Sequence, residues 1–367
     1  MMSDSDYMQY ALDLAARGLY STTPNPRVGC VIVNDHQIVG IGWHQISGGP
    51  HAEVFAIEQA GEKTRGATFY VTLEPCAHFG ATPPCVDAVI AAGAKRVVIA
   101  MDDPNPLVCG KGIAKLQAAG IQTDVGICET EARYLNRGFI SRMTRDRPWV
   151  CVKSGMSLDG RTAMANGESQ WITGPSARDD VQSLRASHCA ILSGIGTVLS
   201  DDPLLNVRLA QIQRQPLRVI VDSQLRLLSE AKLLSQDASQ QGGKVLIATC
   251  VEQADKQKAL EKKGASVVVL PPDQNNQVDL WVLMELLAKK YTINNVLVEA
   301  GATLIGALTQ ANLVDEYIIY LAPKLLGDNA RGLLHLPKIQ HLKEAIGLTI
   351  KDVKMIGQDL RITALCL

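Results

Sequence analysis

Short runs of apolar, often β-branched residues alternate along the chain with stretches in which apolar residues recur at helical spacing. Gly and Pro residues separate these runs, and no internal repeat interrupts them. The alternation is typical of α/β proteins with largely parallel sheets. A first helix, with Ser5 or Asp6 as its capping residue, is predicted from apolar residues on one face: Met8, Ala11, Leu12 and Ala15.

Two apolar runs that flank a short polar turn predict a β-hairpin over residues 28–33 and 38–44. Further strands are predicted at residues 67–73, 96–101 and 121–125. Between and after them, helices are predicted to begin at His51, near Pro84, at Gly112 and at Glu129. The same alternation continues beyond a polar segment at residues 142–148, which ends in Pro148.

This polar segment predicts a boundary between a first domain, residues 1–146, and a second domain, residues 147–367. In the second domain, strands are predicted at residues 149–153, 188–193, 217–222, 244–249, 266–270, 294–299 and 314–322. Helices are predicted at residues 175–186, 278–290 and 302–311. The run at residues 360–365 predicts a final antiparallel strand.

Length and composition agree with a two-domain soluble protein. The chain has 367 residues, and domains average about 150 residues. Its formal net charge of −1 disfavours nucleic-acid binding, which needs a basic face, and its apolar runs are too short to span a membrane. The acidic N-terminus does not resemble a signal peptide, and the nine scattered cysteines favour a reducing compartment, so we expect a cytoplasmic protein.

The strongest chemical pattern is His51-Ala-Glu53, followed by Pro75-Cys76 and Pro84-Cys85. One imidazole and two thiolates are ligands that Zn²⁺ prefers, and three protein ligands leave its fourth position open for catalysis. The pattern therefore predicts one catalytic Zn²⁺ per chain, held by His51, Cys76 and Cys85. Glu53 lies two residues beyond the first ligand, where it can act as the catalytic acid and base without binding the metal.

Two simpler interpretations compete with a catalytic zinc site. Free cysteines are commonly buried, and Cys30, Cys109 and Cys128, which have no motif context, are predicted to be core residues. Alternatively, the zinc is structural and the chain is a binding protein. A structural zinc normally has four protein ligands, and His78 is the nearest candidate for the fourth.

The second domain lacks the G-x-G-x-x-G fingerprint of a Rossmann dinucleotide site; residues 193–197 come close but lack the third glycine. A predicted buried strand instead ends at Glu299, and Gly301 then leads into a helix. The free N–H groups at such a helix start suit a phosphate, although a plain strand–helix junction explains the segment equally well. Further polar residues follow other predicted strands, at the edge where open α/β sheets bind ligands.

The zinc pattern resembles the cytidine and nucleobase deaminase superfamily, whose signature is H-x-E…P-C-x-x-C. Here eight residues, not two, separate Cys76 and Cys85. This spacer and the block at residues 24–29 resemble the bifunctional riboflavin-biosynthesis deaminase/reductase family, and the resemblance continues along the whole chain. Ala81 departs from that family, where Lys or Arg is frequent, so a cation for the substrate phosphate is not expected from this loop.

The resemblance implies an α/β fold with a cytidine-deaminase-like, three-layer α/β/α N-terminal domain and a dihydrofolate-reductase-like C-terminal domain. The first would hydrolytically deaminate 2,5-diamino-6-(5-phosphoribosylamino)pyrimidin-4(3H)-one. The second would use NADPH to reduce the ribosyl group to ribityl. The resemblance places Asn25, His44 and His78 at positions that contact the substrate, although the two histidines, taken alone, fit structural roles.

The resemblance also implies site residues in the second domain. Those along NADPH are Gly155, Trp171, Thr197, Asp201, Ser223, Gly301, Ala302, Thr303, Leu304, Ile305, Gly306 and Ala307. Those that hold the substrate are Ser169, Arg185, Leu205, Arg208 and Glu299, with Lys153 and Asp159 orienting it or supplying a proton. An arginine suits a ribose phosphate because its guanidinium binds two oxygens at once, although Arg185 read alone would be a solvated charge.

One further hypothesis is a nucleic-acid-editing deaminase fused to a docking domain. It would need a basic surface and stacking aromatics, whereas aromatic residues make up only 4% of the chain. The resemblance instead implies a small-molecule pyrimidine ribose phosphate as substrate, with no nucleic-acid or membrane partner. It also implies a homo-oligomer, a dimer or a tetramer, built through the second domain.

Overall fold

The structure is a computed structural model, which describes residues 2–78, 83–106, 108–210, 212–235 and 243–367. The chain divides into two compact units, an N-terminal unit over Met1–Asp146 and a C-terminal unit over Arg147–Leu367. Among the described residues, none of the helices has the length and apolar character that crossing a membrane requires. Each unit is built on one large sheet.

The N-terminal unit holds a five-stranded sheet in the order β2-β1-β3-β4-β5. The hairpin of β1 and β2 is antiparallel, β1 also pairs antiparallel with β3, and β3, β4 and β5 run parallel. The strands are β1 (Gly29–Asn34), β2 (Gln37–Trp43), β3 (Thr68–Val71), β4 (Arg96–Ile99) and β5 (Gln122–Val125). The parallel strands therefore end at one edge of this sheet.

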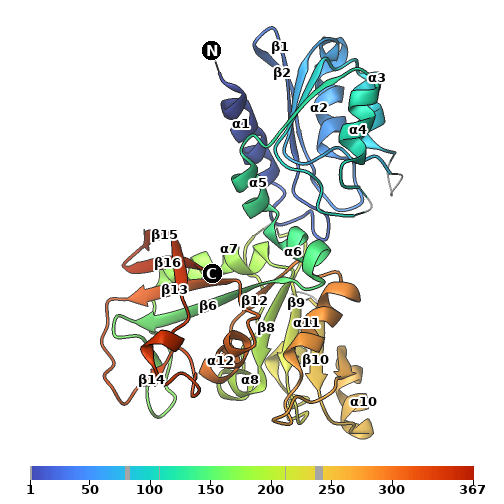
Figure 1. Ribbon diagram of the computed structural model, residues 1–367. Coiled ribbons are helices and arrows are strands. Elements are labelled where there is room, and N and C mark those ends of the chain that lie inside the picture. Colours follow the sequence, from blue (N-terminus) through green and yellow to red (C-terminus); the bar gives the residue numbers. More distant parts are fainter. Residues whose placement is uncertain (1, 79–82, 107, 211, 236–242) are drawn as a thin grey trace. The chain divides into compact units, whose positions relative to one another are not determined.

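Helices cover both faces of this sheet, so the unit has the three layers that the resemblance implies (Figure 1). On β1, Cys30 and Ile32 pack toward α2 (Ala52–Ala60), α3 (Cys85–Ala91) and α4 (Lys111–Ala118). The alternate residues Val31 and Val33 pack toward α1 (Asp4–Ala16) and α5 (Glu129–Leu135). This alternation follows from the two-residue period of a strand. The 3₁₀ turn Gly61–Thr64 follows α2, and α6 (Arg137–Arg145) ends the unit.

The C-terminal unit holds a nine-stranded sheet in the order β11-β10-β9-β8-β12-β6-β13-β16-β15. The strands from β11 to β13 run parallel, and β16 and β15 continue the sheet antiparallel. Their bounds are β6 (Trp149–Ser157), β8 (Ala190–Gly194), β9 (Leu217–Val221), β10 (Val245–Thr249), β11 (Ala265–Val269), β12 (Asn295–Val298), β13 (Glu316–Ala322), β15 (Leu348–Ile356) and β16 (Asp359–Cys366). A small separate sheet pairs β7 (Arg161–Ala163) with β14 (Arg331–Gly332).

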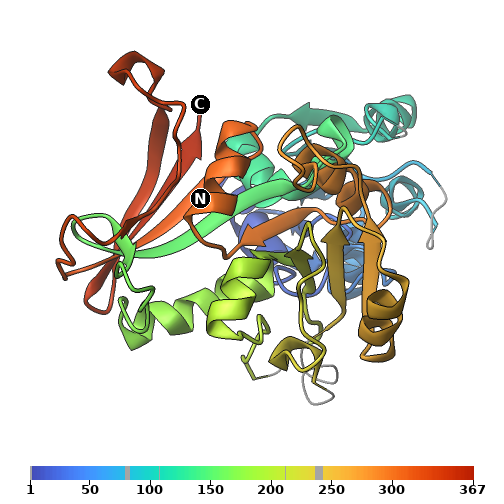
Figure 2. The same ribbon diagram turned by 90° about the horizontal axis from the view of Figure 1, so that it is seen from below.

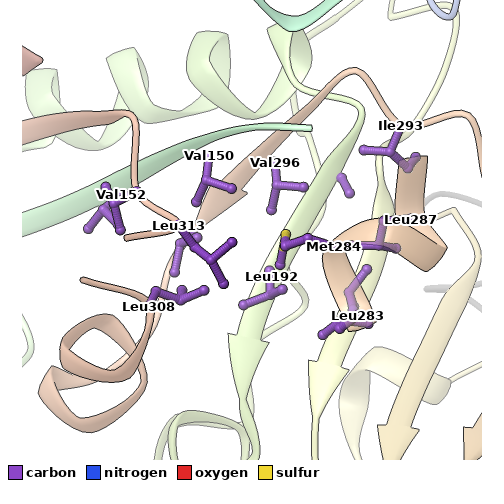
Figure 3. Close-up of a cluster of buried hydrophobic side chains, with 14 of the residues drawn as sticks. Val150, Val152, Leu192, Leu283, Met284, Leu287, Ile293, Val296, Leu308 and Leu313 are labelled. Carbon is purple, nitrogen blue, oxygen red and sulfur yellow. The ribbon is translucent and has the colours of Figure 1, made fainter. Parts of the chain in front are cut away.

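Helices pack on both faces of this larger sheet as well. On one face, α11 (Leu280–Lys289) and α12 (Ala302–Gln310) cover residues such as Leu192 and Val296, which Figure 3 shows inside the main hydrophobic cluster. On the other face lie α7 (Pro175–Ser187), α8 (Ile195–Asp201) and α10 (Ala254–Lys262). Figure 2 shows α7 and α12 on opposite sides of the central strands. Short 3₁₀ turns lie at Lys232–Leu234 and Leu342–Glu344.

The helices and strands predicted from the sequence are present, with small shifts at their ends. Two predictions were wrong in detail. Cys109, predicted to be a core residue, is exposed. The first helix is capped two or three residues earlier than predicted. Its capping residue is Ser3, whose hydroxyl accepts a hydrogen bond from the Asp6 N–H, while the Asp6 carboxylate accepts one from the Ser3 N–H. This reciprocal pair satisfies two helix N–H groups, which neither Ser5 nor Asp6 could do alone.

Candidate zinc and reductase sites

The structure brings His51, Cys76 and Cys85 together in the N-terminal unit. His51 is the residue before α2, Cys76 follows β3, and Cys85 begins α3. The His51 Nδ1 atom lies 2.9 Å from Cys85 Sγ and 3.6 Å from Cys76 Sγ, and the three ligand atoms all lie within 4.8 Å of one another. One zinc ion can bind all three atoms, so the residues fit the metal that the sequence predicts.

Two local features prepare these three side chains for a cation. The backbone N–H of Cys85, at the first turn of α3, donates to Cys76 Sγ at 3.3 Å. Hydrogen bonds from Cys85 and His51 outweigh burial and hold the pKa of the Cys76 thiol well below its usual range, which favours the thiolate form that binds a metal. The group contains no fourth protein ligand among the residues that the structure describes, which leaves an open position.

Glu53 lies in the first turn of α2, close to the three ligands. Its side chain is only 3% exposed, and its Oε2 atom has no hydrogen-bond partner among the described residues. Burial raises the pKa of the Glu53 carboxyl. A buried carboxyl oxygen without a partner is costly, and such atoms are found where a ligand or substrate completes the hydrogen bonds.

Asn25 and His44 form a second polar pair in this unit. His44 Nδ1 lies 3.0 Å from the Pro50 carbonyl oxygen, which can only accept, so Nδ1 carries the proton. Nε2 is then free to accept the hydrogen bond from the Asn25 amide at 3.1 Å. Burial lowers the pKa of the His44 imidazole, in agreement with this neutral form. The His44 ring meets the His51 ring edge-on, with their centroids 5.3 Å apart.

A cavity of about 390 Å³ joins these groups. Its wall includes Asn25, His44, His51, Glu53, Cys76 and His78. It also includes Glu74, Asp103 and Asn105, which sequence reasoning missed. A signal for Asp103 and Asn105 was present in the sequence. They follow the predicted strand at residues 96–101, and polar residues after parallel strands meet at one edge of the sheet. Ala81 lies outside the described residues.

In the C-terminal unit, the neighbouring parallel strands β8 and β12 each lead into a helix. Thr197, in the first turn of α8, therefore lies next to Gly301, which directly precedes α12. A Cβ atom on Gly301 would meet only Thr197 Oγ1, at 3.9 Å, and one on Gly196 would meet nothing within 4 Å. Open space in front of two helix starts fits the phosphates of a dinucleotide cofactor.

A charged cluster lies beside this edge. Arg185 Nε and Nη2 donate to the two Glu299 oxygens at 2.6 and 3.0 Å, and Lys153 Nζ lies 3.8 Å from Glu299 Oε2. Burial acts to raise the pKa of the Glu299 carboxyl, but the charges of Arg185 and Lys153 outweigh it and lower this pKa to about 2. Glu299 is therefore an anion at neutral pH. Burial in turn lowers the pKa of the Lys153 ammonium.

Arg208 completes this cluster. Its Nη1 atom donates to Asn206 Oδ1 at 3.2 Å, while Arg185 Nη1 donates to the Asn206 carbonyl at 3.0 Å. Leu205, just before Asn206, is buried and has a left-handed backbone with φ of 49°. Among the residues that the structure describes, the cations Lys153, Arg185 and Arg208 outnumber the one carboxylate of this cluster, Glu299, so the cluster attracts an anion.

Of the other residues predicted to contact the cofactor, some are at least partly exposed and others are buried. Gly155 on β6 lies against Thr173, and the exposed Trp171 stacks on Arg178 with 4.6 Å between the guanidinium carbon and the ring centroid. By contrast, Ile305 is buried in the core, and a Cβ atom on Gly306 would lie 2.2 Å from the His335 carbonyl oxygen. Exposed residues on α12 near its start are Thr303 and Ala307, with Ala302 and Leu304 half-buried.

The remaining predicted site residues differ in their exposure and in their hydrogen bonds; they are Ser169, Asp201, Ser223 and Asp159. Ser169 is half-buried, and Asp201 is exposed and accepts a hydrogen bond from the Ser200 hydroxyl. The Ser223 hydroxyl already bonds within the protein, to Gln277 Oε1 and to the Val278 N–H. Asp159 accepts from the Ser157 hydroxyl, which lowers its pKa to about 2, and from the N–H groups of Leu326 and Gly327. These bonds hold Asp159 against the segment that contains Leu326 and Gly327.

Comparisons with known proteins agree with both halves of this description. Residues 1–101 match the zinc-binding region of cytidine and deoxycytidylate deaminases, and residues 148–362 match the RibD C-terminal domain. The chain is 50% identical to riboflavin biosynthesis protein RibD of Escherichia coli over 370 residues, with 98% of each chain covered. It is 47% identical to the Haemophilus influenzae protein of the same name, with 98% of this chain and 96% of that protein covered.

Solved structures with the same fold cover the whole length. RibD of Acinetobacter baumannii has a TM-score of 0.90 at 46% identity, with 99% of each chain covered. A diaminohydroxyphosphoribosylaminopyrimidine deaminase/5-amino-6-(5-phosphoribosylamino)uracil reductase from Thermotoga maritima has a TM-score of 0.87 at 33% identity and the same coverage. Both the resemblance stated from the sequence and the predicted α/β fold are confirmed. The chain therefore belongs to the RibD family of riboflavin biosynthesis proteins, and it is an enzyme with a deaminase and a reductase activity.

Proposed function

We propose that the N-terminal unit carries the deaminase, with one Zn²⁺ held by His51, Cys76 and Cys85 and with Glu53 as the catalytic acid and base. Its substrate is 2,5-diamino-6-(5-phosphoribosylamino)pyrimidin-4(3H)-one. One observation carries this proposal: the ligand atoms of His51, Cys76 and Cys85 lie within 4.8 Å of one another, and the cavity that His51 and Cys76 line also contains the buried Glu53, whose Oε2 atom has no partner among the described residues. A cavity of about 390 Å³ suits a small pyrimidine.

Each polar residue of the cavity has its own role in hydrolysis. When bound, zinc supplies Lewis-acid chemistry and lowers the pKa of water. Glu53 takes a proton from the attacking water at its free Oε2 atom and then passes it to the departing amine, which leaves as ammonia. The neutral His44 and Asn25, locked by their mutual hydrogen bond, orient the pyrimidine ring, and His78 contacts it from the cavity wall.

We propose that the C-terminal unit carries the reductase and binds NADPH along the starts of α8 and α12. When bound, NADPH would supply the hydride that reduces C1′ of the ribosyl group, and the ring oxygen would take a proton as the sugar opens to a ribityl chain. Arg185 and Arg208 bind the ribose phosphate, because this cluster has more cations than carboxylates. Glu299 holds Arg185 in place and, together with Lys153, orients the sugar hydroxyls.

A homo-oligomer built through β15 also forms part of this proposal. The strand β15 lies at the outer edge of the larger sheet. Its Leu348, Ile350, Val353 and Met355 are all more than 40% exposed, and they pair with alternate residues of β16, so they share one face. An exposed apolar face of this kind on an edge strand is suited to a second copy of the chain.

The direct test supplies the purified full chain with the diaminopyrimidinone phosphate, zinc and NADPH. Ammonia release and NADPH oxidation are then measured separately. We expect both, with oxidation following ammonia release. Ammonia release without NADPH oxidation would remove the reductase half of the proposal, and oxidation without ammonia release would remove the deaminase half.

A further inference from the structure

Glu74 is a buried carboxylate that none of the proposed catalytic steps uses. It lies between β3 and Cys76, and its side chain is only 3% exposed. Its Oε1 atom accepts hydrogen bonds from the N–H groups of Gly112 at 2.8 Å and Ile113 at 3.2 Å. Its Oε2 atom accepts from Gly110 at 3.0 Å and Asp103 at 3.2 Å. Four backbone donors from one distant segment thus converge on a single side chain.

Three of these donors belong to the start of α4. The residue before this helix, Gly110, has a left-handed backbone with φ of 75° and provides no side-chain cap. A helix leaves its first N–H groups without internal partners, and a carboxylate is also favoured by the positive end of the helix dipole. Glu74 therefore caps α4 from another part of the chain.

The chain approaches itself closely at this cap. A Cβ atom on Gly112 would lie 2.1 Å from the Pro75 carbonyl oxygen, so only glycine allows the start of α4 to lie against the residue next to Cys76. The backbone N–H of Glu74 in turn donates to the Met101 carbonyl at 3.0 Å. The segment that carries Cys76 and the segment that begins α4 are thereby joined.

The segment held by Glu74 forms one wall of the deaminase cavity. Asp103, Asn105 and Val108 line that cavity. Asp103 Oδ1 accepts a hydrogen bond from the Asn105 N–H at 2.9 Å, and Glu74 holds the Asp103 backbone. Although Glu74 borders the cavity, its two oxygens are occupied by the four backbone donors, so its effect on a substrate passes through this wall.

We propose that Glu74 is a positioning residue of the deaminase site, which fixes the wall formed by Asp103, Asn105 and Val108 against the Cys76 segment. The inference rests on the proposed deaminase function of the N-terminal unit. Glu74 acts on the shape of the cavity and not on the metal. Its loss therefore weakens substrate binding more than it affects the chemical step or the zinc content.

The test compares the full-length Glu74→Gln variant with wild-type protein. Glutamine keeps the size of the side chain but offers one acceptor oxygen instead of two, and its NH₂ group faces N–H donors. We expect KM for the diaminopyrimidinone phosphate to rise by about tenfold or more while kcat changes less. Zinc content and NADPH-dependent reduction are expected to match wild type. The matched control is Glu62→Gln, which removes an exposed carboxylate of the same unit.

Amide hydrogen exchange in the wild-type protein tests the inference without any variant. The N–H groups of Gly110, Gly112 and Ile113 are expected to be protected, although first-turn amides of a helix normally exchange fast. Fast exchange at these three positions would overturn the inference, as would a Glu74→Gln variant with unchanged KM or with lost zinc. A wild-type protein without zinc-dependent ammonia release would instead refute the proposed deaminase itself.

Discussion

At the scale of single residues, Glu53 offers the sharpest test of the deaminase chemistry. In Glu53→Gln the three zinc ligands remain, but the side chain can no longer carry a proton. We expect one zinc per chain to remain, while ammonia release falls by ~10²–10⁴-fold, the usual contribution of a general acid or base. Zinc analysis and an ammonia assay check both points.

The matched control for this variant is Glu58→Gln. Glu58 is exposed on the same helix, so its loss leaves both zinc content and ammonia release at the wild-type level. A Glu53→Gln protein that lost its zinc would identify Glu53 as a metal ligand instead. One that kept full activity would leave it without a catalytic role.

Glu299 makes a pH-dependent contribution to the stability of the C-terminal unit. Its pKa of about 2 lies below the ~4.3 of an unfolded glutamate, so the folded state favours the anion. The resulting stability is complete above pH ~4.3 and is lost as the pH falls through about 2. We expect the difference in unfolding free energy between wild type and Glu299→Gln to shrink between pH 5 and pH 2. A constant difference over this range would contradict the assigned ion pair with Arg185.

Sequence analysis predicted the site residues that belong to a recognisable metal-ligand pattern. His51, Cys76 and Cys85 were found because a zinc ion accepts few ligand types, and the structure brings them together. Glu74, Asp103 and Asn105 were missed, since their roles depend on hydrogen bonds between segments that are far apart in the sequence. Gly306 was placed at the cofactor by resemblance; it packs against the His335 backbone, and its contact with the cofactor stays a prediction.

At the scale of helices and strands, two glycines allow a paired test of packing. A Cβ atom on Gly306 of α12 would lie 2.2 Å from the His335 carbonyl oxygen, whereas one on Gly196 of α8 would meet nothing within 4 Å. Gly306→Ala is expected to lower the unfolding free energy by about 1–3 kcal/mol, the usual cost of overpacking. Gly196→Ala is expected to leave it unchanged or raise it by up to ~1 kcal/mol.

Thermal unfolding of the two variants and of wild type measures this difference. An equal effect of both substitutions would show that the close contact at His335 does not constrain α12. The reductase activity of Gly196→Ala is a separate readout, because this residue lies at the proposed cofactor edge.

Strands were predicted best where both faces are buried. The parallel strands of the larger sheet read as continuous apolar runs, and the structure places them within a few residues of the predicted ends. The strand β15 was not predicted. It is exposed along almost its whole length, and its pairing with β16 is interrupted between Ile350 and Asp352, which breaks the two-residue alternation.

At the scale of the whole molecule, the exposed face of β15 predicts how copies of the chain associate. Ile350 and Met355 are 63% and 60% exposed, so lysines there would cost a folded monomer little. We expect the double variant Ile350→Lys/Met355→Lys to have a lower mass than wild type by light scattering at equal concentration. The control Thr349→Lys alters an exposed residue that pairs one position away, on the other face of the strand.

An unchanged mass in the double variant would exclude this face as the interface. A wild-type protein that is already monomeric would refute the oligomer altogether. From the sequence, an oligomer was expected by resemblance only. The apolar pattern of one chain does not show whether a face is covered by the chain itself or by a second copy.

Titration of zinc into metal-free, full-length protein tests the central claim most directly, with ammonia release and NADPH oxidation followed on their separate substrates. Ammonia release is predicted to appear in proportion to bound zinc and to saturate at one ion per chain. Oxidation of NADPH by the already deaminated substrate is predicted to stay constant throughout. Full ammonia release from the zinc-free protein, or saturation only beyond one ion per chain, would contradict the three-ligand site of His51, Cys76 and Cys85.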